Sequence, residues 1–271
     1  MGNCSYLRLN IYRKTAMKNT PEKKKRIWMI IWMVIFLSFI FLDLTFKLFF
    51  HEKEIIKTIA VGGHSFEISV LENGVFIGVK CLKVPAIFLN LIFSLKHNTK
   101  DHFLNAALVL TLLADTFFAF NPSSATAVLI FCFAQFIHSI RFSNNKRFLT
   151  VRGVIMLLFL LIGFVDKIPT IYAFAFVYML LIVGNIHLTF RNFEKEKSSG
   201  VKQKISLALM AFAGFILFFL CDVFIALTFY TASGLLPESL NRYFAFIAWF
   251  FYYPSQVLLI NSSMKQNLSV D

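Results

Sequence analysis

Runs of apolar residues, separated by short polar breaks, cover most of the chain. The hydrocarbon core of a membrane requires about 20 apolar residues per helix, so each long run is a candidate span. We expect eight spans, at residues 27–50, 75–95, 103–120, 125–143, 148–165, 168–190, 205–230 and 240–262. The pattern therefore predicts an all-α membrane protein with eight transmembrane helices.

The composition indicates that lipid, not water, is the solvent for these helices. Of the 271 residues, 58% are hydrophobic and 15% are charged, and the mean hydropathy is +0.71. A water-soluble fold of this length cannot bury so much apolar surface. The four cysteines lack the spacing of a metal or redox site, so we expect neither a metal nor a disulfide framework.

Basic residues are distributed unevenly between the two sides of the predicted bundle. If the N-terminal tail is cytoplasmic, twenty Lys and Arg residues fall on that side and four or five on the other. Because Lys and Arg accumulate in cytoplasmic loops, we expect both termini to be cytoplasmic. The net charge of +13 then reflects membrane orientation, and we expect no nucleic-acid partner.

Three segments are expected outside the bilayer. Residues 1–26 form a basic cytoplasmic tail and residues 263–271 a short cytoplasmic C-terminal tail, with the eight-helix domain at 27–262 between them. Residues 51–74 form an extracytoplasmic loop, in which Gly62-Gly63 precedes an alternating stretch at 64–70. This pattern favours a short β-hairpin or lid.

Polar residues inside the predicted spans are the main candidates for function. Such residues are costly at mid-bilayer and usually face the interior of the bundle. They are Lys80, Lys83, Asn90, Asp115, Gln135, His138, Tyr178, Asn185, Asp222, Tyr252 and Gln256. Several share a helix face, at spacings of three, four or seven residues, so the simplest packing turns them toward a common polar cavity.

Each of these residues also has a structural interpretation. A single Asn or Gln more often holds helices together, and a Lys near a helix end can extend its amine to the membrane surface. Asp115 and Asp222 need partners whether ionised or protonated, and they are therefore the leading functional candidates.

The two aspartates share a local sequence pattern. Ala114-Asp115-Thr-Phe-Phe-Ala119 and Cys221-Asp222-Val-Phe-Ile-Ala226 both follow small-Asp-x-Phe-x-Ala, in spans that run outward and lie four spans apart. The repeat suggests a parallel duplication of a four-helix unit, which would place the two carboxyl groups opposite each other.

Six short motifs occur in order between Lys80 and Ser262. They are Lys83-Val-Pro85, Leu-Leu-Ala114-Asp115, Phe133-Ala-Gln-Phe-Ile-His138, Tyr178, the block from Gly214 to Asp222 with Ala226-Leu, and Tyr252-Tyr253-Pro-Ser-Gln256. Their order and spacing resemble those of the YhhN family of lysoplasmalogenase-like membrane proteins. The chain departs from the family pattern at Ala114, where glycine is usual, at Cys221, where serine is usual, and at Arg141, where a tyrosine is common.

The resemblance implies hydrolysis of the vinyl ether bond of lysoplasmalogen to a fatty aldehyde and glycerophosphoethanolamine or glycerophosphocholine. Two carboxyl groups in a membrane cavity suit this reaction without a metal or cofactor, because one acid protonates the alkene and the other carboxylate stabilises the cation. Catalytic roles are expected for Asp115 and Asp222, and substrate-binding roles for Lys80, Lys83, His138, Tyr178, Tyr252 and Gln256. The two lysines would bind the phosphate, and the headgroup is expected toward the basic side.

Two other functions remain open at this point. A proton-coupled membrane transporter uses the same intramembrane acids and bases, and a catalytically silent lipid-binding family member would keep the fold. The expected partners are the lysophospholipid substrate and the lipid bilayer. The resemblance favours the endoplasmic reticulum membrane, or the inner membrane if the source is bacterial.

Overall fold

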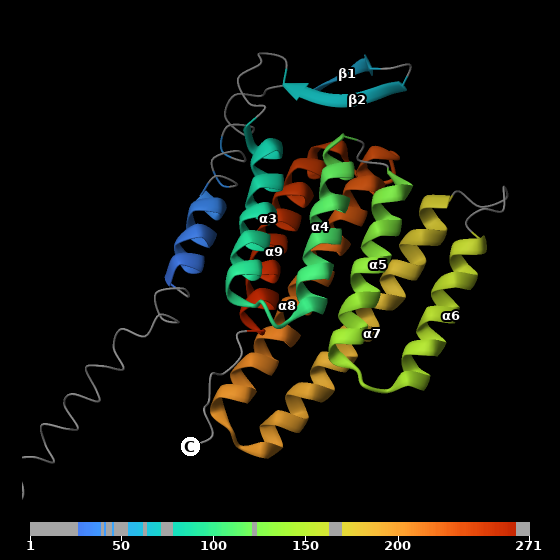
Figure 1. The fold of residues 1–271 in the computed structure, drawn as a ribbon. Coiled ribbons are helices and arrows are strands. Elements are labelled where there is room, and N and C mark those ends of the chain that lie inside the picture. Colours follow the sequence, from blue (N-terminus) through green and yellow to red (C-terminus); the bar gives the residue numbers. More distant parts are fainter. Residues whose placement is uncertain are drawn as a thin grey trace, which may run out of the picture.

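The computed structural model describes residues 27–38, 41, 45, 54–61, 64–71, 78–120, 124–162 and 170–263. The predicted tail at 1–26 lies outside the described residues, as does the predicted tail at 263–271 except for Ser263. Most of the described chain is helical, and its helices stand side by side, as Figure 1 shows.

Eight helices in the described chain fall on the eight predicted spans. They are the Ile27–Ser38 helix, α3 (Gly78–His97), α4 (His102–Phe120), α5 (Ala125–Phe142), α6 (Lys146–Ile162), α7 (Thr170–Ser199), α8 (Lys202–Ala232) and α9 (Asn241–Asn261), with the 3-10 turn η2 (Glu238–Leu240) before α9. Within the described ranges, five helices are long and apolar enough to cross a membrane, namely α4, α5, α7, α8 and α9. The protein is therefore a helical integral membrane protein.

Two helices extend beyond the spans predicted for them. The segment between the predicted spans 168–190 and 205–230 is largely helical, because α7 continues to Ser199 and α8 already begins at Lys202. The charged residues of this stretch are compatible with a helix exposed to water. Gly200, with φ of 71°, ends α7 in the left-handed conformation that glycine adopts without strain, and so allows the sharp turn into α8.

Polar side chains fix the starts of three helices. Ser124 Oγ accepts a hydrogen bond from Ala127 N at 3.2 Å at the start of α5. Asp101 Oδ1 accepts from Leu104 N at 3.0 Å at the start of α4. Asn145 Oδ1 accepts from Phe148 N at 3.3 Å at the start of α6. These N-caps satisfy backbone amides that have no partner within the helix.

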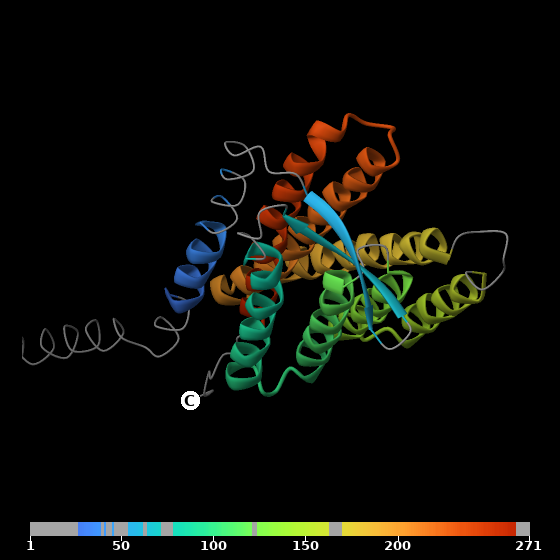
Figure 2. The same ribbon diagram turned by 90° about the horizontal axis from the view of Figure 1, so that it is seen from above.

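The hairpin predicted within residues 51–74 is present. Strand β1 (Glu54–Val61) pairs with the antiparallel strand β2 (His64–Leu71), and Val61 pairs with His64 across a two-residue connection. Figures 1 and 2 show the hairpin across the end of the bundle at which α3 begins. Gly62-Gly63 in the connection agrees with the glycine preference of tight hairpins.

The helices pack mainly as neighbours in sequence, with α5 also against α7 and α3 also against α9. The Ile27–Ser38 helix joins this core through Phe36, whose ring stacks on Tyr253 of α9 with centroids 4.2 Å apart. Helix α6 lies at the edge of the bundle against α5 and α7, and several of its apolar side chains, such as Leu157, are exposed. An apolar outer surface of this kind is expected for helices that contact lipid.

A polar cluster ties three helix ends together at the end of the bundle opposite the hairpin. Arg141, near the end of α5, forms an ion pair with Asp101 (Nε to Oδ2, 2.9 Å) and donates to Ser262 Oγ at 3.1 Å. The hydroxyl of Ser263 donates to the same Asp101 oxygen. Asn98 Nδ2 donates to the carbonyl of Ile260 at 3.0 Å. The α3–α4 turn, α5 and the end of α9 are therefore held in one arrangement.

The pKa of Asp101 lies below its usual value of 3.8. Burial would raise this pKa, but the positive charge of Arg141 and the hydrogen bonds from Ser263, Leu104 N and Arg141 together outweigh burial. A lowered pKa in the folded protein means that the ionised carboxylate stabilises the fold. This stabilisation is fully present above the unfolded-state pKa and is lost as the pH falls through the folded-state value.

We predict that Asp101→Asn lowers the free energy of unfolding by about 3 kcal/mol at pH 7, because it leaves the buried Arg141 charge unpaired. The difference from wild type should shrink as the pH falls below about 3.8. Unfolding of the detergent-solubilised protein measures both effects. The control is Glu194→Gln, which removes an exposed carboxylate from α7. Equal stability of Asp101→Asn and wild type at pH 7 would contradict the prediction.

Candidate functional site

Two tyrosine–aspartate pairs form the centre of the candidate site. Tyr178 of α7 donates a hydrogen bond to Asp222 Oδ2 of α8 at 2.6 Å. Tyr252 of α9 donates to Asp115 Oδ2 of α4 at 2.5 Å. Each pair joins two helices, so four helices supply this part of the site. Hydrogen bonds to carboxyl groups at these distances are short and strong.

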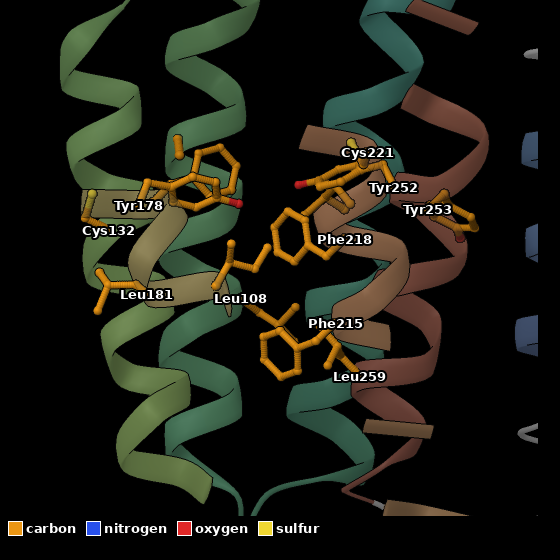
Figure 3. Close-up of a cluster of buried hydrophobic side chains, with 14 of the residues drawn as sticks. Leu108, Cys132, Tyr178, Leu181, Phe215, Phe218, Cys221, Tyr252, Tyr253 and Leu259 are labelled. Atoms are coloured by element: carbon orange, nitrogen blue, oxygen red, sulfur yellow. The ribbon is translucent and has the colours of Figure 1, made fainter. Parts of the chain in front are cut away.

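The two pairs belong to one cluster. The carboxyl groups of Asp115 and Asp222 are close enough for their charges to interact. The hydroxyl of Tyr252 interacts electrostatically with Tyr178, and Figure 3 shows both hydroxyl groups directed toward the middle of the bundle. The structure therefore brings these four side chains together at the centre of the bundle.

Aromatic rings surround the pairs. Phe218 packs edge-on against Tyr252, with ring centroids 5.5 Å apart, and against Phe131 at 6.1 Å. Phe131 in turn contacts Tyr178 at 5.9 Å. Cys221 is buried beside both tyrosines. The acids therefore lie among apolar groups, where a hydrogen bond or a charge acts more strongly than in water.

Gln256 and His138 lie toward the opposite end of the bundle from the hairpin, relative to the two pairs. Gln256 is one turn beyond Tyr252 on α9, and its Nε2 is buried without a partner among the described residues. His138 packs edge-on against Phe215, and its Nδ1 is likewise buried without such a partner. His138 lies about one helical turn before Arg141 on α5, toward the polar cluster at the helix ends.

A separate buried network occupies the interface of α5, α6 and α7. Asn185 donates to the carbonyl and to the side-chain oxygen of Gln135, both at 2.9 Å. Its own oxygen accepts from Ser139 at 2.8 Å and from Arg152 at 3.1 Å. Arg152 also donates to the carbonyl of Leu181 at 2.5 Å. Gln135 and Asn185 therefore hold helices together, which is the structural role that the sequence offered for them.

Lys80 and Lys83 lie in the first two turns of α3, at the hairpin end of the bundle. Their side chains lie outside the described residues. Asn90, farther along α3, is buried, and its Nδ2 has no partner among the described residues. The backbone therefore places the two lysines at the end of the bundle opposite Asp101 and Arg141.

Sequence reasoning misses three residues that form buried or partly buried polar contacts in the structure. Asp101 falls in the polar segment between the predicted spans 75–95 and 103–120. Arg152 is counted in the sequence only among the cytoplasmic basic residues. Arg141 counts only as a loop charge and as a departure from the family pattern. The position of Arg152 within a largely apolar run is the sequence signal that it enters the bundle. In the structure, its guanidinium lies against Gly184 of α7. In the part of the chain that the structure describes, His, Cys, Asp and Glu side chains do not gather in threes as they would to bind a metal.

Helices of membrane-spanning length around two partly buried tyrosine–aspartate pairs define a polytopic membrane protein with paired acids inside its helix bundle. The model of the YhhN family matches residues 75–263, which include both aspartates and both tyrosines. The chain belongs to the YhhN family. Neither the curated proteins nor the solved structures give a match to the chain.

We predict that Gly184→Ala destabilises the protein by about 2 kcal/mol, because the new Cβ overpacks the α6–α7 interface. That Cβ would lie 2.5 Å from Arg152 Nη2, so the guanidinium would have to leave its buried hydrogen bonds. Gly153→Ala, on the neighbouring helix, is the matched control, since its Cβ would meet Phe136 at an ordinary 3.4 Å. Thermal unfolding measures the stability of both variants. Equal stability of the two would contradict the role assigned to Gly184.

Proposed function

We propose that this protein hydrolyses the vinyl ether bond of lysoplasmalogen, with Asp115 and Asp222 as the catalytic residues. The observation that supports the proposal best is the convergence of two tyrosine-bound carboxyl groups in one partly buried cluster inside the bundle. Membership of the YhhN family is consistent with a hydrolase. The products are a fatty aldehyde and glycerophosphoethanolamine or glycerophosphocholine.

The proposed reaction begins with a proton transfer to carbon. One protonated carboxyl group gives its proton to the alkene carbon remote from the ether oxygen, and the π electrons form the new C–H bond. The other carboxylate stabilises the oxocarbenium ion and then takes a proton from the water that attacks it. The second carboxyl group, now protonated, gives this proton to the glycerol oxygen as the bond between that oxygen and the hemiacetal carbon breaks. The first carboxylate takes the proton of the hemiacetal hydroxyl, whose oxygen becomes the carbonyl of the aldehyde. One water is consumed, and both carboxyl groups are back in their starting states.

Tyr178 and Tyr252 act as positioning residues in this proposal. Each donates its hydroxyl proton to the Oδ2 atom of one aspartate, and so fixes the direction of the other carboxyl oxygen. Because the two tyrosines come from different helices, the two acids are held independently. A carboxyl group held in one orientation transfers a proton to a fixed carbon more readily than a rotating group does.

The substrate is proposed to lie between the helices, with its headgroup toward the hairpin end. Lys80 and Lys83, at the start of α3, are the proposed phosphate-binding residues. The headgroup is therefore proposed to lie at the hairpin end, and not at the opposite, basic end as the sequence led us to expect. Gln256, which lies on the other side of the aspartates from the hairpin end, is proposed to bind water through its buried Nε2, which has no partner among the described residues. His138, which lies about one turn before Arg141 on α5, is also a proposed substrate contact.

We also propose eight membrane spans with both termini in the cytoplasm, because the twenty Lys and Arg residues on one side satisfy the positive-inside rule. The helix ends at Asp101 and Arg141 are then cytoplasmic, and the hairpin is extracytoplasmic. A location in the endoplasmic reticulum remains an expectation from the family resemblance.

We predict that Asp115→Asn and Asp222→Asn each lower aldehyde release from lysoplasmalogen by at least about 100-fold, since each removes a proton donor or acceptor. Purified wild type and variants would be compared in detergent or proteoliposomes, with thermal unfolding to show that each variant folds. Near-normal release by either folded variant would contradict the assignment. If the wild type moved labelled lipid across proteoliposomes without cleavage, the protein would be a carrier and not this hydrolase.

Tyrosine variants supply a matched control. Tyr178→Phe and Tyr252→Phe remove the hydroxyl groups that bind the aspartates and should lower the rate about 10-fold or more. Tyr253→Phe alters the neighbouring residue of α9, whose ring stacks on Phe36 outside the aspartate cluster, and should leave the rate unchanged. Equal effects of all three substitutions would indicate a general loss of packing.

The direction of proton transfer gives a further prediction. Hydrolysis in D₂O should place one deuterium on the carbon next to the aldehyde group, and hydrolysis in ¹⁸O-water should place the label in the aldehyde. Both follow from protonation of the alkene carbon and attack of water on the oxocarbenium ion. Mass spectrometry of the aldehyde, trapped as it forms, measures both labels. An aldehyde without deuterium would rule out the proposed first step.

A further inference from the structure

An open pocket of about 620 Å³ lies where α5 ends and α6 begins, far from the aspartates. Its lining comprises Phe142, Ser143, Asn144, Asn145, Leu188, Arg191, Asn192 and Lys195. The first four come from the α5–α6 turn and the last four from α7. None of these residues belongs to the proposed hydrolytic site.

The pocket is positively charged. Arg191 and Lys195 are four residues apart on α7, so they project from the same face of the helix into the same lining. The eight lining residues include no carboxylate, and three of them are asparagines, which can donate further hydrogen bonds. Two cations beside amide donors form a site that suits a phosphate group.

Local hydrogen bonds hold the walls in place. Asn192 Nδ2 donates to the carbonyl of Phe142 at 3.4 Å, which links α7 to the end of α5. Asn145 N donates to Ser143 Oγ at 3.2 Å, and Asn145 caps the first turn of α6. The positive end of the 17-residue helix α6 therefore adjoins the pocket and favours an anion there.

The position of the pocket points to a lipid. It lies where α5 ends at Phe142, while α7 continues for several more turns. Phe142 and Leu188 give it apolar walls, and α6, which begins beside it, carries exposed apolar side chains such as Val151, which is 56% exposed. Basic pockets at the cytoplasmic ends of membrane helices bind phosphate headgroups of lipids.

We propose that this pocket binds the phosphate group of an anionic phospholipid from the same leaflet. Arg191 and Lys195 contact the phosphate, the asparagines contact the remaining headgroup oxygens, and the acyl chains lie against α6 and α7. The site is separate from the hydrolytic site, so its occupation and the cleavage of lysoplasmalogen can be tested independently.

The test compares two double variants of the full-length protein that change the net charge equally. Arg191→Gln with Lys195→Gln removes both cations of the pocket. Lys197→Gln with Lys202→Gln removes two cations from the nearby ends of α7 and α8 that do not line it. Native mass spectrometry in detergent, with added phosphatidic acid or phosphatidylcholine, measures the bound lipid. Thermal unfolding checks that both variants fold.

We expect the pocket variant to bind phosphatidic acid at least about 10-fold more weakly, because it loses two charge-assisted contacts, and the control variant to bind it as wild type does. Equal binding by all three proteins, or equal weakening in both variants, would overturn the proposal. Inorganic phosphate is the second probe. If phosphate binds in a manner that depends on Arg191 and Lys195 while the lipid does not, the lipid assignment is wrong and the ligand is a soluble phosphate. Aldehyde release should be the same in both variants, whatever its level in wild type.

Discussion

Hydrocarbon offers no hydrogen-bond partner, and this constraint decides how the helices of the bundle meet. A polar side chain inside a span is stabilised by a partner on another helix or on the backbone, since an unpaired group costs several kcal/mol. Asp222 finds Tyr178, and Asp115 finds Tyr252. The side-chain amide of Asn185 donates to the carbonyl of Gln135 on α5, and Arg152 donates to the carbonyl of Leu181 on α7. The interhelical contacts that carry polar chemistry are therefore also contacts that fix the register of the helices.

Hydropathy alone predicts the fold well, because the length of an apolar run is fixed by the thickness of the membrane. The predicted spans at 103–120 and 125–143 differ by one residue or less at each end from α4 and α5. The hairpin also follows from the sequence, through Gly62-Gly63 and the alternation after it. The extension of α7 to Ser199 does not, since outside the bilayer a polar helix and a polar loop have the same hydropathy. Neither the number of spans nor the position of the termini is fixed by the helices themselves.

The candidate site is predictable in part. Asp115, Asp222 and the two tyrosines are identifiable because an acid or phenol deep in an apolar run is costly and rarely serves packing alone. The ion pair of Asp101 and Arg141 is not identifiable, because each residue lies at a helix end where charges are ordinary. Membership of one site depends on the rotation of each helix about its axis, and spacing within a single helix does not determine that rotation. His138 illustrates this, as it lies three residues after Gln135 on α5 yet packs against Phe215 of α8, whereas Gln135 contacts Asn185 of α7.

The suggested duplication accounts for the packing better than for the acid pairs. A shift of four spans maps the α4–α5 contact onto α8–α9 and the α3–α4 contact onto α7–α8, and all four pairs of helices do pack together. The same shift maps the pair of Asp222 with Tyr178 onto Asp115 with a residue of α3, but α3 contains no tyrosine, and Asp115 is bound by Tyr252 of α9 instead. Under the suggested duplication, the two aspartates would occupy related positions with unrelated partners. Two carboxyl groups with identical surroundings would share a proton equally, whereas different surroundings favour one as the acid and the other as the carboxylate. The break in symmetry around the aspartates is therefore the feature that an acid–base reaction requires.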